Sequence, residues 1–298
     1  MTTAQSLPYA ALESQLAQIE FWRSEVGLEY AGFVKGQVES SRVWTRPASD
    51  MRQAIGNTLQ LATPFFVSSE IIQVLHNSMG DFPKDLPFDS FWPEVNMGWA
   101  HMETPFMIPF DKEPDELECK ALLWVPQPGE DKRLSVVFFG GSIGGAYSAA
   151  LRFWAVQILQ PDATIANSLE DESMAESRFG LFGVRFLAVF FSFLRQKLVS
   201  LQGQRAPRPA RKRFWRITQT EAPLVRVIQL RRREVRGKEN GHGEPRDWSH
   251  RWIVSGHWRK QWYSSRHRHE PLFIDSYVKG PDDKPLKARR VNLYAVVN

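Results

Sequence analysis

Apolar side chains recur at helical spacing in two stretches near the start of the chain. Leu12, Leu16 and Ile19 follow one another at intervals of three and four residues, which predicts an amphipathic helix over residues 11–22. A second helix is expected over residues 68–80, because a pair of serines that can cap it precedes an apolar run and a glycine follows. Both helices would bury one face against a core.

Two continuous apolar runs in the middle of the chain predict a β-hairpin. Residues 119–125 and 134–139 are the expected strands, and the segment between them carries a Pro-Gly pair suited to a turn. The following residues 148–159 are expected to be helical. Together with the predicted N-terminal helices, these elements describe a region of mixed helices and hairpin.

The longest apolar stretch of the chain, residues 179–194, is rich in Phe, Leu and Val. A membrane-spanning helix needs about 20 apolar residues, and Arg185 interrupts this shorter stretch. We therefore expect a buried core helix near residues 179–201. An interfacial helix is the alternative, because Arg195 and Lys197 follow directly.

The last part of the chain alternates apolar and polar residues between glycine- and proline-containing turns, a pattern typical of antiparallel strands. The expected strands cover residues 224–230, 248–259, 272–278 and 291–297. The predicted fold class is therefore α+β, with a mixed helical and hairpin N-terminal region and a small basic antiparallel β-sheet at the C-terminus. The predicted domains are residues 1–202, a basic linker at 203–213, and a basic β domain at 214–298.

Charge divides the chain at nearly the same place. Residues 205–298 hold 23 basic and 9 acidic residues, a net charge of +14, whereas residues 1–204 hold 15 basic and 24 acidic residues, a net charge of −9. A strongly basic module usually has an anionic partner. RNA or DNA is the expected partner, and an acidic protein is the alternative.

The side chains of a strand alternate between two faces, so one strand over residues 248–259 would separate tryptophans from cations. Trp248, Trp252 and Trp258 would share a core face. The polar faces of the aligned strands would bring together Arg251, His257, Arg259, Asp275, Tyr277, Lys279 and Arg290. Arginine binds phosphate through paired hydrogen bonds, and exposed aromatic rings stack on unpaired bases. The alternative is a solvated sheet face whose charges prevent edge pairing.

The same face contains residue types that can cleave RNA without a metal ion. His257 is the candidate base, Arg251 and Arg259 would hold the phosphate, and Tyr277 or Lys279 would serve as the acid. The loop histidines are further candidates for the acid. Additional nucleic-acid-binding residues are expected in the linker and around the strands: Arg211, Lys212, Arg213, Arg231, Arg232, Arg233, Lys260, Trp262, Arg266, His267, His269 and Arg290.

No cofactor is expected, and no metal site. The pair His267 and His269 is surrounded by arginines, which disfavour a dication, and the single cysteine, Cys119, excludes a thiolate-rich zinc site. Residues 140–144 read Gly-Gly-Ser-Ile-Gly after a predicted strand, so a serine hydrolase with Ser142 as nucleophile and Asp171 as orienting residue is a remote alternative. A glycine-rich turn is the simpler interpretation.

The first ten residues lack the basic start and apolar block of a signal peptide. We expect no membrane span, and a cytoplasmic location fits the use of a single cysteine.

A short string in the basic part resembles a family of proteins. Residues 247–252 read Asp-Trp-Ser-His-Arg-Trp, residues 256–259 Gly-His-Trp-Arg, and residues 277–281 Tyr-Val-Lys-Gly-Pro. They are similar to the C-terminal signature of proteins from actinobacteria, their plasmids and their phages. The resemblance covers roughly the last 55 residues and implies an association with mobile elements, and through it a role as a toxin or in phage–host conflict. It brings no catalytic residue with it.

These observations favour a nucleic-acid-binding protein of a mobile element. A more specific form of this hypothesis is a metal-independent endoribonuclease toxin. The alternative from another class is a non-enzymatic interaction protein that binds an acidic protein or DNA, in replication control or in the inhibition of a host factor.

Overall fold

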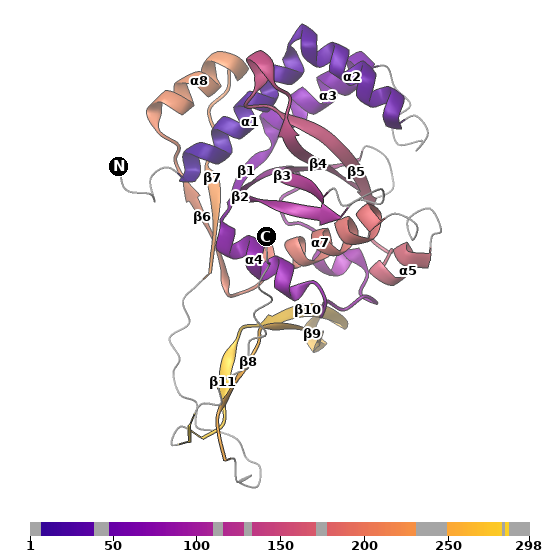
Figure 1. Ribbon diagram of the computed structural model, residues 1–298, viewed down its shortest axis with the longest axis vertical. Helices are drawn as coiled ribbons and strands as arrows, with labels where there is room; N and C mark the ends of the chain where they lie inside the picture. The colour runs from indigo at the N-terminus through magenta and orange to yellow at the C-terminus, as the bar shows by residue number, and fades with distance from the viewer. Residues whose placement is uncertain are drawn as a thin grey trace, which may run out of the picture.

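The computed structural model describes residues 7–38, 48–109, 116–127, 133–170, 178–230, 249–281 and 284–285. A seven-stranded mixed sheet carries helices on both of its faces, and two small antiparallel ribbons lie beyond it (Figure 1). The fold class is α+β, as the sequence predicts.

The seven-stranded sheet has the strand order β5-β4-β3-β2-β1-β7-β6. Its strands are β1 (Thr63–Val67), β2 (Gly98–Pro109), β3 (Glu116–Pro126), β4 (Leu134–Ser142), β5 (Leu151–Leu159), β6 (Val199–Gln204) and β7 (Val225–Leu230). β1 runs parallel to both β2 and β7, and the other neighbouring pairs are antiparallel. The predicted hairpin is confirmed as the pair β3–β4.

One face of the sheet is covered by four helices: α1 (Leu7–Arg23), α2 (Glu25–Val38), α3 (Ala48–Leu61) and α8 (Arg208–Thr218) (Figure 1). Trp22 of α1 and Phe214 of α8 are fully buried in a cluster that also contains Trp99 and Phe139 of the strands. The predicted helix over residues 11–22 is confirmed. α8 therefore packs on the same core as the N-terminal helices, although nearly 200 residues separate them in sequence.

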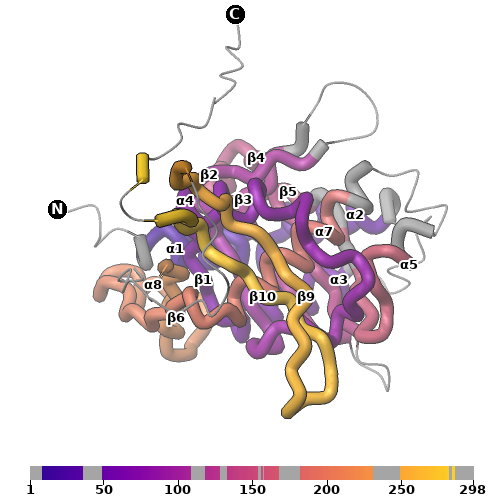
Figure 2. Tube along the Cα trace, turned by 90° about the horizontal axis from the view of Figure 1, so that it is seen from below, coloured from indigo at the N-terminus to yellow at the C-terminus, as the bar shows by residue number. Residues whose placement is uncertain are grey.

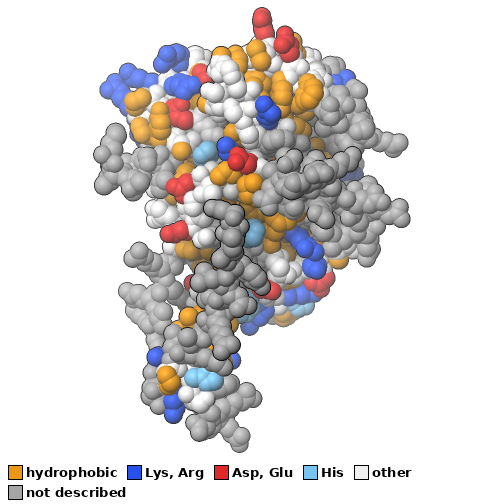
Figure 3. All heavy atoms as spheres, viewed as in Figure 1, with side chains coloured by type: hydrophobic (Ala, Val, Ile, Leu, Met, Phe, Trp, Pro, Cys, Tyr) orange, Lys and Arg blue, Asp and Glu red, His pale blue; other side chains and the backbone are white. Residues whose placement is uncertain are grey.

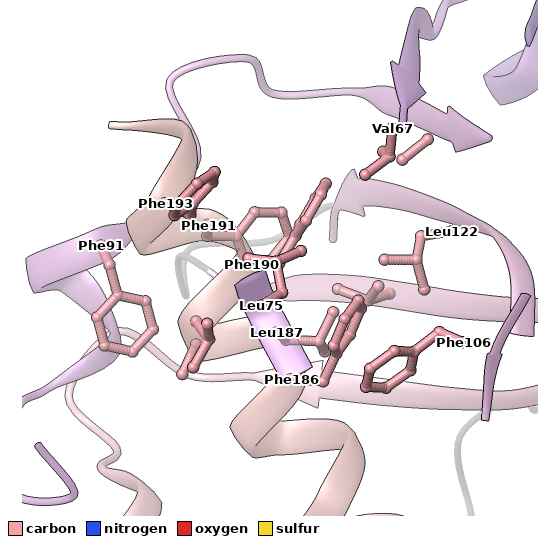
Figure 4. Packing of buried hydrophobic residues seen from close by; sticks show 14 of the residues in the cluster. Val67, Leu75, Phe91, Phe106, Leu122, Phe186, Leu187, Phe190, Phe191 and Phe193 are labelled. Atoms are coloured by element: carbon pink, nitrogen blue, oxygen red, sulfur yellow. The ribbon is translucent and has the colours of Figure 1, made fainter. Parts of the chain in front are cut away.

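The other face carries α4 (Ser69–Ser78), α5 (Ile165–Glu170), α7 (Arg178–Leu194) and a short 3-10 helix (Phe88–Phe91). The predicted core helix near residues 179–201 is confirmed as α7, although it ends at Leu194 and residues 199–201 already belong to β6. The phenylalanines of α7 lie against the strands (Figure 4). The ring centroids of Phe186 and Phe106 are 4.0 Å apart, and those of Phe191 and Trp124 are 5.5 Å apart. Among the described residues, no helix is both long and apolar enough to span a membrane.

The predicted start of α4 is also correct. Ser68 is its N-cap, and its hydroxyl accepts a hydrogen bond from the Ile71 amide. This local signal needs no tertiary information, because a serine before an apolar helical run satisfies one of the free amides of the first turn.

Two expectations for the middle and the end of the chain need correction. Residues 151–159 form a strand, β5, and not a helix, because they pair along their length with β4. Residues 203–213 are no extended linker: they finish β6 and make up the first half of α8. Ala210 and Phe214 are buried at helical spacing, and Pro209 lies in the first turn, where a missing amide hydrogen is tolerated.

The C-terminal strands do not form one sheet. β9 (His257–Tyr263) pairs with β10 (Arg268–Ile274), while β8 (Trp252–Val254) pairs separately with β11 (Tyr277–Lys279). The predicted strand over residues 248–259 breaks at Ser255 and Gly256, where a side chain on the glycine would place its Cβ 2.8 Å from the ring of Phe273. The third predicted strand, residues 272–278, breaks in the same way between β10 and β11. β7, the first of the predicted C-terminal strands, belongs to the main sheet. The expected strand at 291–297 lies outside the described residues.

Candidate anion-binding surfaces

The β9–β10 hairpin is anchored in the main core. Trp258 and Phe273 are 5% and 7% exposed, and the Trp258 ring lies 5.2 Å from the rings of both Phe82 and Phe273. The side-chain amide of Gln196 at the end of α7 accepts a hydrogen bond from the Phe273 amide at 3.0 Å and donates one to the Pro271 carbonyl at 3.1 Å. In Figure 2 the turn of the hairpin extends beyond the rest of the chain.

Most cations of this hairpin are engaged by carboxylates. Lys260 pairs with Asp85, and Arg268 contacts Asp89 at 3.0 Å. Arg266 and Arg268 both bind Glu270, at 2.7 Å and 2.9 Å. Two of these carboxylates come from the acidic first part of the chain, so opposite charges of the two parts meet here. These ion pairs orient the hairpin and reduce the positive charge that it offers to a ligand.

The pKa shifts agree with this pairing. The hydrogen bond from Lys260 lowers the pKa of Asp85. For Glu270, burial alone raises the pKa, but the hydrogen bonds and charges of Arg266 and Arg268 outweigh it, so the pKa is lowered. Both carboxylates therefore stay ionised and keep their arginine and lysine partners occupied.

The outer part of the hairpin presents fewer exposed groups than the sequence suggested. Trp262 is 48% exposed, and its ring lies 5.0 Å from that of His269 on the neighbouring strand. Arg259 is exposed and donates to the Gln261 side chain. His267 is exposed at the turn, with a left-handed backbone of φ 49°. A role in ligand binding for Arg259, Trp262, His267 and His269, and for their ion-paired neighbours, remains a prediction.

The proposed catalytic set does not come together on one sheet. His257 and Arg259 belong to β9, whereas Tyr277 and Lys279 belong to β11 of the other ribbon. The Nδ1 atom of His257 lies 3.0 Å from the Ser255 carbonyl. Arg251 donates through Nε to the Lys284 carbonyl at 2.8 Å, and the Lys279 ammonium lies 5.9 Å from the centre of the Trp252 ring. Trp252 is therefore not a core residue of the same face as Trp258.

Replacing His257 by alanine is therefore expected to leave any affinity of the chain for RNA unchanged, because one ring nitrogen of the imidazole is already in contact with the Ser255 carbonyl. Fluorescence anisotropy with a labelled RNA would measure this. A parallel incubation in chelator would follow cleavage of the same RNA. Cleavage by the wild-type chain that disappears in His257→Ala would contradict the expectation and support the endoribonuclease interpretation.

Ser142 is the last residue of β4 and pairs with Leu151 of β5, at the start of the turn between the two strands. Its hydroxyl donates to the Ser148 carbonyl at 2.7 Å and accepts from the Gly144 amide at 3.1 Å. A short 3-10 helix, Gly145–Tyr147, and then β5 follow it, in place of the long helix that a nucleophile elbow requires. Gly144 has φ 90°, a value that suits glycine in a tight turn.

Several residues of the sequence-based prediction cannot be placed. Arg231, Arg232, Arg233, Arg290, Trp248 and Asp171 lie outside the described residues. Within the described ranges, no group of three or more His, Cys, Asp and Glu side chains is arranged to hold a metal ion.

α8 presents a second basic surface, and its two sides differ sharply. On the inner side, Phe214 is fully buried, and Arg213 forms ion pairs with Glu13 and Glu20 of α1, the latter at 2.6 Å. Arg211 lies at the margin and donates through Nε to the Ala206 carbonyl at 3.0 Å. Of the three basic residues predicted here, Arg213 thus holds α8 in place, and Lys212 faces solvent.

The outward side of α8 is defined by Arg208, Lys212, Trp215 and Arg216, all of which are exposed. We call these four residues the α8 face. Within the described part of the chain, its three cations have no carboxylate within ion-pair distance. Trp215 is 56% exposed. Lys and Arg side chains gather over α8 at the upper left of Figure 3, at the opposite end of the molecule from the β9–β10 hairpin.

Three of these four residues, Arg208, Trp215 and Arg216, are missing from the sequence-based set. Their signal is the helical spacing of Ala210, Phe214 and Thr218, which are buried and so turn the remaining residues outward. The prolines at 207 and 209 concealed it, because proline within a short basic stretch also suggests a linker.

No known protein family matches the chain, and no curated protein matches it. The crystal structure of AcrVA2 aligns with 92% of this chain and 96% of that chain, at 10% sequence identity and a TM-score of 0.42. A likeness at this level says nothing about ligand or activity.

Proposed function

We propose that the protein binds nucleic acid without cleaving it, and that the α8 face is its principal phosphate-binding surface. The observation that carries this proposal is the difference between two groups of cations. Lys260, Arg266 and Arg268 of the hairpin are paired with carboxylates, and Arg259 is the exception. Arg208, Lys212 and Arg216 are all exposed without such partners among the described residues. Unpaired cations in a row attract a polyanion and release its counterions on binding.

Binding without cleavage is proposed because the groups required for metal-free RNA hydrolysis are divided between two ribbons. General acid–base catalysis needs the base and the acid within hydrogen-bonding reach of one phosphate. The resemblance of residues 247–281 to plasmid and phage proteins supports a mobile element as the biological setting of this proposal.

The triple variant Arg208→Ala/Lys212→Ala/Arg216→Ala is expected to weaken nucleic-acid binding and its dependence on salt. Each phosphate contact contributes about 0.7–0.9 to the slope of log affinity against log salt, so the loss of three contacts should flatten the slope by roughly 2–3. Anisotropy titrations at several salt concentrations measure both quantities.

A matched control removes the same charge elsewhere. Lys84, Lys197 and Arg226 are exposed and lie outside α8, the two lysines in turns and the arginine on β7. The variant Lys84→Ala/Lys197→Ala/Arg226→Ala therefore changes the net charge equally. This control should keep most of the wild-type slope. Equal losses in the two triple variants would mean that net charge alone, and not the α8 face, governs binding. Stronger competition by polyglutamate than by an oligonucleotide would favour an acidic protein as the partner.

A further inference from the structure

We infer that the α8 face binds a single strand in preference to a duplex, with Trp215 stacking on an unpaired base while the neighbouring cations hold the phosphates. This inference rests on the proposed function and specifies its ligand. It starts from the exposure of Trp215 beside a row of exposed cations on the same helix.

The helix geometry places these side chains on one side of α8. Successive residues of an α-helix are rotated by about 100° and rise by about 1.5 Å. Arg208, Lys212 and Trp215 therefore fall within an arc of roughly 60°, with Trp215 on the opposite side of Arg208 from Lys212. Arg208, Lys212 and Arg216 follow one another at rises of about 6 Å, and the tryptophan lies between the last two along the axis.

The rest of the helix does not need the indole of Trp215. Phe214 supplies the buried aromatic ring of α8, and no aromatic contact of Trp215 is found within the described residues. The carbonyl of Trp215 accepts the Gln219 amide at 2.8 Å to end the helix, which any residue could do. By contrast, Trp22, Trp99 and Trp124 are completely buried. A large apolar side chain kept half in water beside unpaired cations is suited to contact with a ligand.

The ligand chemistry follows from what each group can contact. The cations can contact the phosphates of single strands and of duplexes alike, because both expose their backbones. An indole can stack only on a base whose face is free, and the bases of a duplex already stack on each other. A nucleic acid that uses both kinds of group must therefore expose its bases. An acidic peptide would satisfy the cations and leave the indole without a stacking partner.

The test compares Trp215→Ala, Trp215→Phe and Lys212→Ala by anisotropy, with a single-stranded oligonucleotide and with a duplex of the same sequence. Trp215→Ala should weaken binding of the single strand by roughly 5- to 150-fold and leave duplex binding unchanged. Trp215→Phe should retain most of the single-strand affinity. Lys212→Ala should weaken binding of both ligands and flatten the slope of log affinity against log salt by about 0.7 for the single strand and about 0.9 for the duplex.

Two results would overturn the inference: an equal loss of single-strand and duplex binding in Trp215→Ala, or wild-type binding of the single strand by that variant. A failure of the proposed function looks different, because the wild-type chain would then bind neither ligand in a salt-dependent way. Far-UV circular dichroism and the thermal midpoint of Trp215→Ala should match the wild type, since the side chain lies at the surface. If Trp215→Ala does not match the wild type in these two measurements, Trp215→Phe still tests the inference through its single-strand affinity.

Discussion

Replacing Trp258 by alanine is expected to lower the free energy of unfolding by about 3–5 kcal/mol, as for other buried aromatic side chains. The indole is 5% exposed and lies 5.2 Å from the ring of Phe82, which comes from the first part of the chain. The substitution leaves a cavity where the β9–β10 hairpin meets the main core. Urea denaturation followed by fluorescence and by far-UV circular dichroism measures the loss.

Trp262→Ala is the matched control, because Trp262 lies on the same strand and is 48% exposed. Its effect should stay within about 0.5 kcal/mol. Both variants should unfold in a single transition that is the same for the two probes, because the hairpin shares its core with α7. A separate early transition of the hairpin, or a small effect of Trp258→Ala, would mean that the hairpin folds as an independent module.

Stability should also fall with acid because of one buried histidine. The pKa of His101 is lowered from 6.5 to about 4, mainly by burial; the charge of Glu103 partly offsets this shift, and that of Lys120 adds to it. Below pH 6.5 the unfolded chain gains a proton at His101, whereas the folded chain remains neutral there until about pH 4. The contribution of this group is therefore complete above pH 6.5 and declines towards pH 4, by about 3 kcal/mol in total.

The variant His101→Leu removes this titration and isolates its share of the acid sensitivity. The difference in unfolding free energy between wild type and variant should change by about 3 kcal/mol from pH 7 to pH 4, with the wild type losing more. A wild-type chain and a His101→Leu variant that lose stability in parallel would show that folding does not lower the pKa of His101.

Local patterns were sufficient for the elements whose signal lies within a few residues. The helical spacing of Leu12, Leu16 and Ile19 predicts α1, and Ser68 predicts the start of α4. The apolar runs of β3 and β4 with a Pro-Gly turn between them predict their hairpin. Each of these elements buries one face that is visible in the sequence.

Other elements depend on partners far away in the chain. Residues 151–159 are apolar enough for a buried helix or a buried strand, and their pairing with β4 decides for the strand. The course of residues 203–213 is decided by the pairing of β6 with β7 and by the burial of Phe214 against α1. Neither contact has a local signal.

The candidate site shows the same limit. The sequence located the basic part of the chain, and it included Lys212 among the binding residues. It could not show which cations are neutralised, because Lys260 meets Asp85 across 175 positions and Arg268 meets Asp89 across 179. The charge count therefore favoured the hairpin as the binding surface, whereas the distribution of ion pairs in the structure favours the α8 face.

Photochemical cross-linking tests the central proposal most directly, because it locates the bound strand on the intact chain. A single-stranded oligonucleotide with a photoreactive base would be bound at low salt, irradiated, and mapped by mass spectrometry of the proteolysed complex. Adducts are expected within α8, Arg208–Thr218, and should disappear in the triple variant Arg208→Ala/Lys212→Ala/Arg216→Ala. Adducts confined to residues 257–269, unchanged in that variant, would contradict the proposal.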